Sequence, residues 1–493
     1  MSQKIKQKET WNMLRKPWIL LTIIGIVGLI IRLNFLPYDL PFIGDAVGYF
    51  WYANDLAISG EFPSKILDSD REMFPNNGWS TFLSVFFWFL ESEDFLDFVN
   101  LQRVVGIVIS CITIIPVYYL GKKFFNYKLA LVSATLFIFS PRLIENSFNG
   151  TTESSFLLLV ISSLVLFLSD RYRNLVLAFL LAGMCVLVRY EGLLIIFPLS
   201  VMYFIRFKRK KHLFRNYLFL LLVFILIILP MAHIRMESTG QDGIITHVSS
   251  GPKYYEIMSQ QNTDENMFLN YALKGISFMA KFMGIMTIPM FALFLPLGVI
   301  GFFKKWDSKK LTIIVFSVTF LIPAFYAYSR GFEEMKYLFI LYPLLILIST
   351  YSFEKIFLKI KKENLFILVS IVGIIFVSII FSEIMIPEFE HEKEIYQITK
   401  DVVPYVSSIN RDYTGLNYLV WIKSEINDKF PSLSTKIQEN SERVKIIRIG
   451  EGTENNFDNL NDYLKFGKVN GMNELIVEQN SAKFLLEILQ NEK

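Results

Sequence analysis

Cysteine and histidine are scarce in this 493-residue chain, which has two cysteines and four histidines. Cys111 and Cys185 both lie inside apolar stretches, which argues against a disulfide framework and against a thiolate metal site. The histidines are scattered over positions 212, 233, 247 and 391, which excludes a histidine-rich metal motif. No nucleotide-binding motif, internal repeat or low-complexity tract is visible. We therefore expect no cofactor, with a divalent metal ion left open.

Charge is the second scarcity. Charged residues make up 19% of the chain, against 53% hydrophobic and 16% aromatic residues, and the mean hydropathy is +0.42. Soluble domains do not combine these values, and apolar runs of about 20 residues recur. The composition predicts a polytopic α-helical membrane protein whose partner is the lipid bilayer and not a nucleic acid.

A group of basic residues precedes the first apolar run, so the N-terminal segment could pass for a signal peptide. The basic residues are Lys4, Lys6, Lys8, Arg15 and Lys16. No small-residue cleavage site follows, since the run ends in Ile30-Ile31-Arg32-Leu33. We expect an uncleaved anchor with a cytoplasmic N-terminus.

The Lys/Arg clusters predict the topology, because basic residues mark cytoplasmic loops. Residues 79–90 are strongly apolar, but this run of about twelve residues is short for a crossing, so we expect a helix lying in the outer interface. With this choice every Lys/Arg cluster falls on one side and the chain has about eleven spans. The spans cover residues 18–35, 101–120, 129–140, 154–168, 175–188, 217–232, 311–328 and 365–386, with three more ending before the clusters at 206–215, 304–310 and 355–362.

Two domains are expected. Residues 1–386 form the membrane domain, with a first outer loop at 36–100 and a long outer loop at 233–274. From Pro387 onward apolar runs shorten and charges alternate. We expect strands at 444–449 and 474–478 and helices at 395–406, 457–466 and 482–489, which together make a soluble extracytoplasmic α/β domain over residues 387–493.

Polar residues collect in the loops on the outer side. They are Asp45, Tyr49, Glu61, Asp68, Asp70, Arg71, Arg142, Glu145, Glu153, Arg189, Glu191, His233, Arg235, Arg330, Glu333, Glu334 and Lys336. Carboxylates interleaved with arginines at a membrane surface suit a substrate with a lipid tail, an anionic head and a hydroxyl to be activated. Asp45 follows the first span, where a carboxylate is costly to place.

Each outer residue also has a plain structural explanation. Asp45 could cap a helix that starts at Ala46. Arg189 and Glu191 could be interfacial anchors, and Glu153 could be an N-terminal helix charge. Glu333 and Glu334 could be solvated loop charges, and we expect His233 to be structural.

Four short motifs resemble the GT-C superfamily of polyprenyl-phosphate-sugar-dependent glycosyltransferases, in particular prokaryotic relatives of protein O-mannosyltransferases and aminoarabinose transferases. The motifs are Gly44-Asp45-Ala46 with Tyr49, Phe139-Ser140-Pro141-Arg142 leading to Thr152-Glu153, Val188-Arg189-Tyr190-Glu191-Gly192, and Lys336-Tyr337-Leu338 with Tyr342-Pro343. The resemblance covers about residues 15–390. Two departures stand out: Ala46 replaces the second acidic residue of many relatives, and Lys336 stands where arginine is usual, which weakens a bidentate phosphate contact. The Trp-Trp-Asp motif of oligosaccharyltransferases is absent, which disfavours that branch.

The resemblance implies an inverting transfer of a sugar, a hexose such as mannose or a related one, from a polyprenyl phosphate to a hydroxyl of a lipid, glycan or protein. The reaction takes place at the extracytoplasmic face of the cell membrane. It implies Asp45 as the base and Arg189, Arg330 and Lys336 as ligands of the donor phosphate. Tyr49, Glu153 and Glu191 are supporting residues. Two other functions stay open: a flippase of lipid-linked sugars, although repeats and midplane charges are missing, and a membrane-anchored assembly protein.

Overall fold

The structure is a computed structural model that describes residues 17–63, 77–92, 94–246 and 267–386, positions 389, 392, 393 and 396, and strand backbones at 443–449, 474–479 and 482–489. The chain divides into two compact units. The first comprises Met1–Leu36, Met73–Thr81 and Arg103–Ile386. The second comprises Pro37–Glu72, Phe82–Gln102 and Pro387–Lys493.

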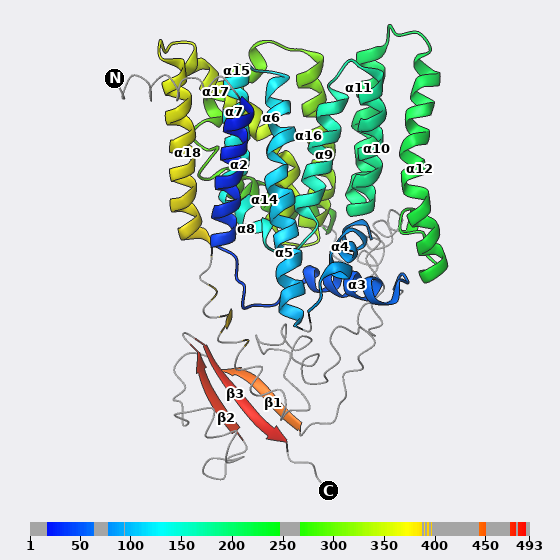
Figure 1. The fold of residues 1–493 in the computed structure, drawn as a ribbon, viewed down its shortest axis with the longest axis vertical. Helices are drawn as coiled ribbons and strands as arrows, with labels where there is room; N and C mark the ends of the chain where they lie inside the picture. Colours follow the sequence, from blue (N-terminus) through cyan, green and yellow to red (C-terminus); the bar gives the residue numbers. More distant parts are fainter. Residues whose placement is uncertain are drawn as a thin grey trace. The chain divides into compact units, whose positions relative to one another are not determined.

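The first unit is a helical bundle (Figure 1). Two segments are 3-10 helices, η1 and η2, and each leads directly into an α-helix. The elements are α2 (Pro17–Asn34), α6 (Ile114–Lys122), α7 (Tyr127–Ile138), α8 (Pro141–Ser147), α9 (Glu153–Phe167), α10 (Tyr172–Val188), η1 (Tyr190–Ile195), α11 (Ile196–Phe207), α12 (Leu213–Thr239), α14 (Met267–Thr287), α15 (Leu295–Lys304), α16 (Ser308–Ser329), η2 (Met335–Leu341), α17 (Tyr342–Phe357) and α18 (Glu363–Met385). The helix α5 (Phe95–Ile112) begins in the second unit and continues into the first.

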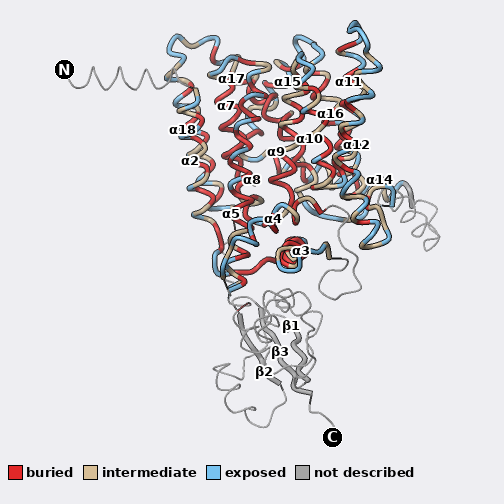
Figure 2. Tube along the Cα trace, turned by 45° about the vertical axis from the view of Figure 1, so that its right-hand side comes forward, coloured by how far each residue is buried: buried red, intermediate tan, exposed pale blue. Residues whose placement is uncertain are grey.

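Helix α7 is the core of this unit, because every residue from Leu129 to Ile138 is buried (Figure 2). It packs against α2, α6, α17 and α18. The Asn126 side chain caps its start by accepting hydrogen bonds from the Lys128 and Leu129 amides. It ends before Pro141, which begins α8, and the two helices are bent by 54°.

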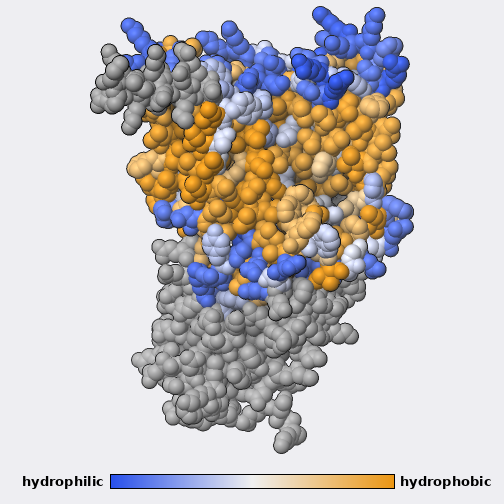
Figure 3. All heavy atoms as spheres, in the orientation of Figure 1, coloured by the Kyte–Doolittle hydropathy of each residue, from blue (hydrophilic) through white to orange (hydrophobic). Residues whose placement is uncertain are grey.

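Helices α12 and α18 differ from α7 in burial, because few of their residues are buried. They are strongly apolar, yet only 17% and 28% of their most apolar stretches are buried inside the protein. Such an arrangement suits a hydrocarbon solvent, in which only structures with internally satisfied backbones are stable. The first unit has a broad apolar band between hydrophilic ends (Figure 3). The chain is a multi-pass membrane protein.

Every expected span coincides with a helix or a pair of helices. Within the described residues, seven helices are long and apolar enough to cross a membrane, or up to eight if the bent pair of α7 and α8 counts as one span. Helices α9, α10 and α15 are apolar but shorter. The number eleven therefore stays a prediction.

The basic loops of the bundle lie at one end. Lys128, in the first turn of α7, pairs with Glu363 at the start of α18, at 2.6 Å. Lys309, at the start of α16, donates to the Lys123 carbonyl at 3.4 Å. Arg206, near the end of α11, donates to the carbonyl of Phe167 at the end of α9. These contacts connect three of the loops that carry Lys/Arg clusters to one another and two further loops to each other, in line with a one-sided distribution of basic residues.

The described part of the second unit contains α3 (Asp45–Ser59), most of α4 (Gly78–Phe89) and the start of α5. Phe87 of α4 packs against Phe50 of α3 and Phe98 of α5, with ring centroids 5.4 and 5.3 Å apart. Gly60 ends α3 at φ 71°, a left-handed conformation in which glycine avoids the steric cost of a side chain. Helix α4 is the expected 12-residue helix.

The C-terminal region contains a three-stranded antiparallel sheet in the order β1 (Arg443–Ile449), β3 (Ala482–Leu489), β2 (Glu474–Gln479). The two expected strands are confirmed. The helix expected at 482–489 is wrong: this segment is β3, the middle strand, with Val444 opposite Ile488 and Leu475 opposite Leu486. A short apolar run is compatible with either a helix or a strand. Here the segment forms a strand because it pairs with β1 on one side and β2 on the other. The helices expected at 395–406 and 457–466 lie outside the described residues except for Tyr396, so the α/β class stays a prediction.

Candidate functional site

Three parts of the chain that are distant in the sequence meet at the end of the bundle away from the basic loops: the start of α9, the end of α10 with η1, and η2. Helix α9 begins with Glu153 and runs toward the basic end, whereas α10 runs away from it and ends just before Arg189. Because α9 and α10 pack against each other as antiparallel neighbours, the first turn of one meets the last turn of the other. Segment η1 continues from Arg189, and η2 packs against α9 and α16.

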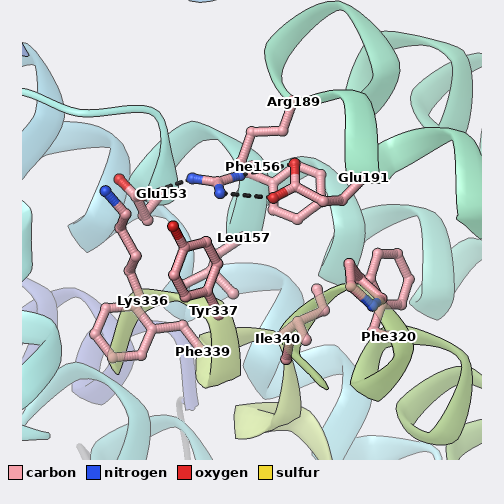
Figure 4. Close-up of a pocket in the computed structure, with 12 residues that line it drawn as sticks. Glu153, Phe156, Leu157, Arg189, Glu191, Phe320, Lys336, Tyr337, Phe339 and Ile340 are labelled. Carbon is pink, nitrogen blue, oxygen red and sulfur yellow. Dashed lines mark hydrogen bonds and ion pairs between the residues drawn. The ribbon is translucent and has the colours of Figure 1, made fainter. Parts of the chain in front are cut away.

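Arg189 occupies the centre of this site (Figure 4). Its backbone leaves the helix (φ −145°, ψ 135°), while its amide still donates to the Cys185 carbonyl at 2.9 Å. The guanidinium binds Glu191 in a bidentate manner, with Nη2 to Oε1 at 2.8 Å and Nε to Oε2 at 3.3 Å. Nη1 donates to Glu153 Oε1 and to Thr152 Oγ1, the latter at 3.1 Å.

The three charged side chains are largely removed from solvent, with exposed fractions of 14% for Arg189, 4% for Glu153 and 9% for Glu191. A planar guanidinium with its donors in a fork matches two carboxylates well and fixes their orientation. The face of Phe156 lies 5.8 Å from Arg189 Cζ and adds a cation–π contact. The arrangement holds two acids at fixed positions with one positive charge between them.

The second carboxylate oxygen of Glu153, Oε2, is buried and has no hydrogen-bond partner among the described residues. A charged oxygen in this position is costly unless something donates to it. Glu153 also lines a pocket of about 400 Å³, a volume that includes space open to solvent.

The pocket has one polar and one apolar side. Glu153, Arg189, Glu191, Lys336 and Tyr337 form the polar side, and in Figure 4 Lys336 and Tyr337 extend toward the Arg189 cluster. Lys336 also pairs with Glu334. The apolar lining consists of Phe156, Leu157, Phe320, Pro323, Ala324, Phe339 and Ile340. This division of the lining matches that of an amphiphile, which has a polar head and an apolar chain.

The structure thus brings together Glu153, Arg189, Glu191 and Lys336 from the expected set. Arg330 is exposed, lies between the rings of Tyr326 and Phe332 at 5.5 and 5.1 Å, and is not among the residues that line this pocket.

The remaining expected site residues, Asp45 and Tyr49, belong to the second unit. Asp45 is exposed and Tyr49 is buried. Helix α3 begins at Asp45 itself, with Gly44 as the N-cap. The capping explanation for Asp45 is therefore wrong, because Asp45 occupies the first turn, where the helix dipole favours a carboxylate. The catalytic and phosphate roles stay predictions.

The other polar residues expected on the outer side form ordinary ion pairs and hydrogen bonds away from this pocket, or lie outside the described residues. Lys281 pairs with Glu333 at 3.3 Å, His233 with Glu237 at 3.3 Å, and Arg142 with Glu145 at 3.1 Å. Arg235 donates to Asn77 Oδ1 at 3.0 Å. Asp68, Asp70 and Arg71 lie outside the described residues.

Sequence reasoning missed Thr152 and Tyr337 as site residues, although both stand inside motifs that carried the resemblance. It also missed Arg32, which is fully buried near the end of α2. Among the described residues, no group of three or more histidine, cysteine or acidic side chains could hold a metal ion.

A family model described as dolichyl-phosphate-mannose-protein mannosyltransferase matches residues 98–234. This segment includes Glu153, Arg189 and Glu191. No curated protein sequence matches the chain.

Solved structures match over much greater lengths. The ArnT from Cupriavidus metallidurans bound to undecaprenyl phosphate is 12% identical, with a TM-score of 0.54 over 94% of this chain and 97% of that chain. The oligosaccharyltransferase of Archaeoglobus fulgidus in the apo form is 13% identical, with a TM-score of 0.54 over 93% of this chain and 64% of that chain. This chain thus spans less than two thirds of the archaeal enzyme. The matched family segment and the shared fold confirm the resemblance to the GT-C superfamily of membrane glycosyltransferases.

Proposed function

We propose that this protein is a glycosyltransferase that moves a sugar from a polyprenyl phosphate to an acceptor hydroxyl at the extracytoplasmic face of the cell membrane. The observation that carries the proposal is the pocket in which Glu153, Arg189, Glu191 and Lys336 face an apolar wall. A lipid-linked sugar has the same division into a charged, hydroxyl-bearing head and an apolar chain. The family model names a dolichyl-phosphate mannose donor and the ArnT relative binds undecaprenyl phosphate, which supports a lipid-phosphate donor and a hexose such as mannose.

The donor phosphate requires positive groups. Arg189 was expected among them, but four of its N–H···O contacts already go to Glu153, Glu191 and Thr152. We therefore assign the main phosphate contact to Lys336, which lines the pocket, with Arg189 holding the carboxylates. Arg330, which does not line the pocket, is proposed as a second phosphate contact on the strength of the resemblance alone. The Glu334 partner of Lys336 is half exposed, so exchanging it for a phosphate costs little.

The chemistry is one displacement. The acceptor oxygen attacks the anomeric carbon of the sugar, the bond from that carbon to the phosphate oxygen breaks, and polyprenyl phosphate leaves with both electrons. Asp45 takes the proton of the acceptor hydroxyl. Lys336 and Arg330 stabilise the phosphate as its charge grows. Attack from the side opposite the leaving group inverts the configuration.

Proteoliposomes that contain the purified protein, a panel of polyprenyl-phosphate sugars and a hydroxyl acceptor test the proposal. We expect free polyprenyl phosphate to accumulate together with glycosylated acceptor for at least one donor. A flippase would instead move the intact lipid-linked sugar across the bilayer. Translocation without release of polyprenyl phosphate across the whole panel would overturn the proposal.

A further inference from the structure

One buried polar atom in the pocket, Glu153 Oε2, is not accounted for by the contacts described above. Oε1 of the same carboxylate binds Arg189, whereas Oε2 is buried with no partner among the described residues. Only 4% of this side chain is exposed, so bulk water does not satisfy the oxygen. A buried carboxylate oxygen in a pocket wall is an acceptor that awaits a donor.

We propose that Glu153 recognises the transferred sugar, with Oε2 accepting a hydrogen bond from a sugar hydroxyl and Arg189 acting as its positioning residue. This inference rests on the proposed function and adds the part of the substrate that enters this pocket. It makes Glu153 a specificity-determining residue and leaves proton removal to Asp45.

The charges in the pocket favour a hydroxyl over a phosphate at this position. A carboxylate has no hydrogen to donate, and a phosphate next to it would add like-charge repulsion. The arginine that could have attracted the phosphate is bound to Glu153 and Glu191 on both sides. A sugar hydroxyl is a neutral donor and satisfies Oε2 without adding charge.

The rest of the pocket suits the same ligand. Lys336 lines it, so a phosphate joined to the sugar can meet a cation while the ring meets Glu153. Phe156, Phe320 and Phe339 offer apolar surface to the C–H face of a sugar ring and to the first units of the lipid chain.

Arg189 sets the orientation of Glu153. Its Nη1 binds Glu153 while its other edge binds Glu191, which lies only two positions along the chain and is fixed by η1. The recognising oxygen is therefore held by a rigid fork rather than by a freely rotating side chain.

The test compares the wild type with Glu153→Gln on donors that carry the sugar and on monodeoxy analogues that each lack one hydroxyl. For the wild type we expect one analogue to lose roughly 10- to 100-fold in kcat/KM, the value of a hydrogen bond to a charged group. Glu153→Gln should lose most of this discrimination against that analogue while it treats the other analogues as the wild type does. Glu145→Gln, which removes the carboxylate partner of Arg142 outside the pocket, is the matched control and should keep the wild-type discrimination.

Binding measured by native mass spectrometry separates this inference from the proposed function. The wild type should retain a polyprenyl-phosphate sugar better than bare polyprenyl phosphate, and Glu153→Gln should abolish the preference. If the wild type releases no polyprenyl phosphate but shows this preference, the proposed function fails and the sugar site stands. If Glu153→Gln keeps both the preference and the hydroxyl discrimination, the inference is overturned. Glu153→Asp, which keeps a carboxylate for Arg189, replaces the glutamine variant if the latter does not fold, and should show weakened discrimination.

Discussion

Arg189 separates two acidic side chains that would otherwise face each other inside the protein. Removing one member of a buried ion pair typically costs about 3–5 kcal/mol, because the remaining charge stays desolvated. We predict that Arg189→Ala lowers the free energy of unfolding in detergent by this amount. Arg142→Ala breaks an ion pair whose side chains are 22% and 33% exposed, and should cost about 1 kcal/mol or less. Equal effects of the two substitutions would show that Glu153 and Glu191 do not depend on Arg189.

Arg32, in contrast to Arg189, is a buried charge with no carboxylate partner among the described residues. Its side chain is fully buried in α2, Nη1 donates to the Gly28 carbonyl at 3.0 Å, and Nε and Nη2 have no partner among the described residues. Replacing a poorly compensated buried charge with an apolar side chain of similar volume is often stabilising, by about 1–4 kcal/mol. Arg32→Met should therefore raise the thermal midpoint of the purified protein. A lowered midpoint would mean that the guanidinium has a partner that the described residues do not supply.

At the residue scale, the sequence predicted several residues of the site but not which side chains pair with one another. The motifs and the common side of the loops predicted that Glu153, Arg189, Glu191 and Lys336 could approach one cavity. They did not predict that Arg189 would be engaged by both acids, because side-chain partners depend on how helix ends meet in three dimensions. Glu153 stands 36 positions from Arg189 in the sequence, and only the antiparallel packing of α9 and α10 joins them.

Segment η1 depends on a glycine at one point. A Cβ added to Gly192 would lie 2.5 Å from the Cys185 carbonyl carbon and 2.6 Å from its oxygen, and backbone atoms cannot move aside cheaply. Gly192→Ala should push η1 away from α10, weaken the Arg189–Glu191 contact and lower the free energy of unfolding by about 1–3 kcal/mol. Gly25→Ala in α2, where an added Cβ meets nothing within 4 Å, is the control and should be neutral or slightly stabilising. An unfolding midpoint of Gly192→Ala equal to that of the control would contradict this packing.

At the element scale, apolar periodicity and length predicted where helices occur, including the 12-residue α4. They did not predict β3, because a run of eight residues has no length signal of its own and its conformation follows from its two neighbours in the sheet. The break between α7 and α8 also follows from local chemistry, with Pro141 opening the second helix.

The whole chain should place its basic loops in the cytoplasm and the region after Pro387 outside. We predict that a cysteine introduced at Ser408, in a background that lacks Cys111 and Cys185, reacts with a membrane-impermeant maleimide on intact cells. A cysteine at Lys210, in the most basic loop, should react only after permeabilisation. The reverse pattern would invert the topology.

At the scale of the molecule, composition predicted a multi-pass membrane protein, and the short motifs predicted the resemblance to the GT-C superfamily. The sequence could not divide the first outer loop from the bundle, whereas the structure groups Pro37–Glu72 with the C-terminal region in the second unit. Such grouping depends on contacts between segments far apart in the chain, which a single sequence does not record.

The most direct test of the proposed transfer compares the purified wild-type protein with Asp45→Asn, each incubated with polyprenyl-phosphate sugars and a hydroxyl acceptor. Asparagine keeps the size of the side chain at the start of α3 but cannot take up the proton. We predict that the wild type releases polyprenyl phosphate from at least one donor. The variant should keep its unfolding midpoint and its donor binding but lose turnover by roughly 10²- to 10⁴-fold. Equal turnover by the two proteins, or no release by the wild type from any donor, would contradict the proposed mechanism.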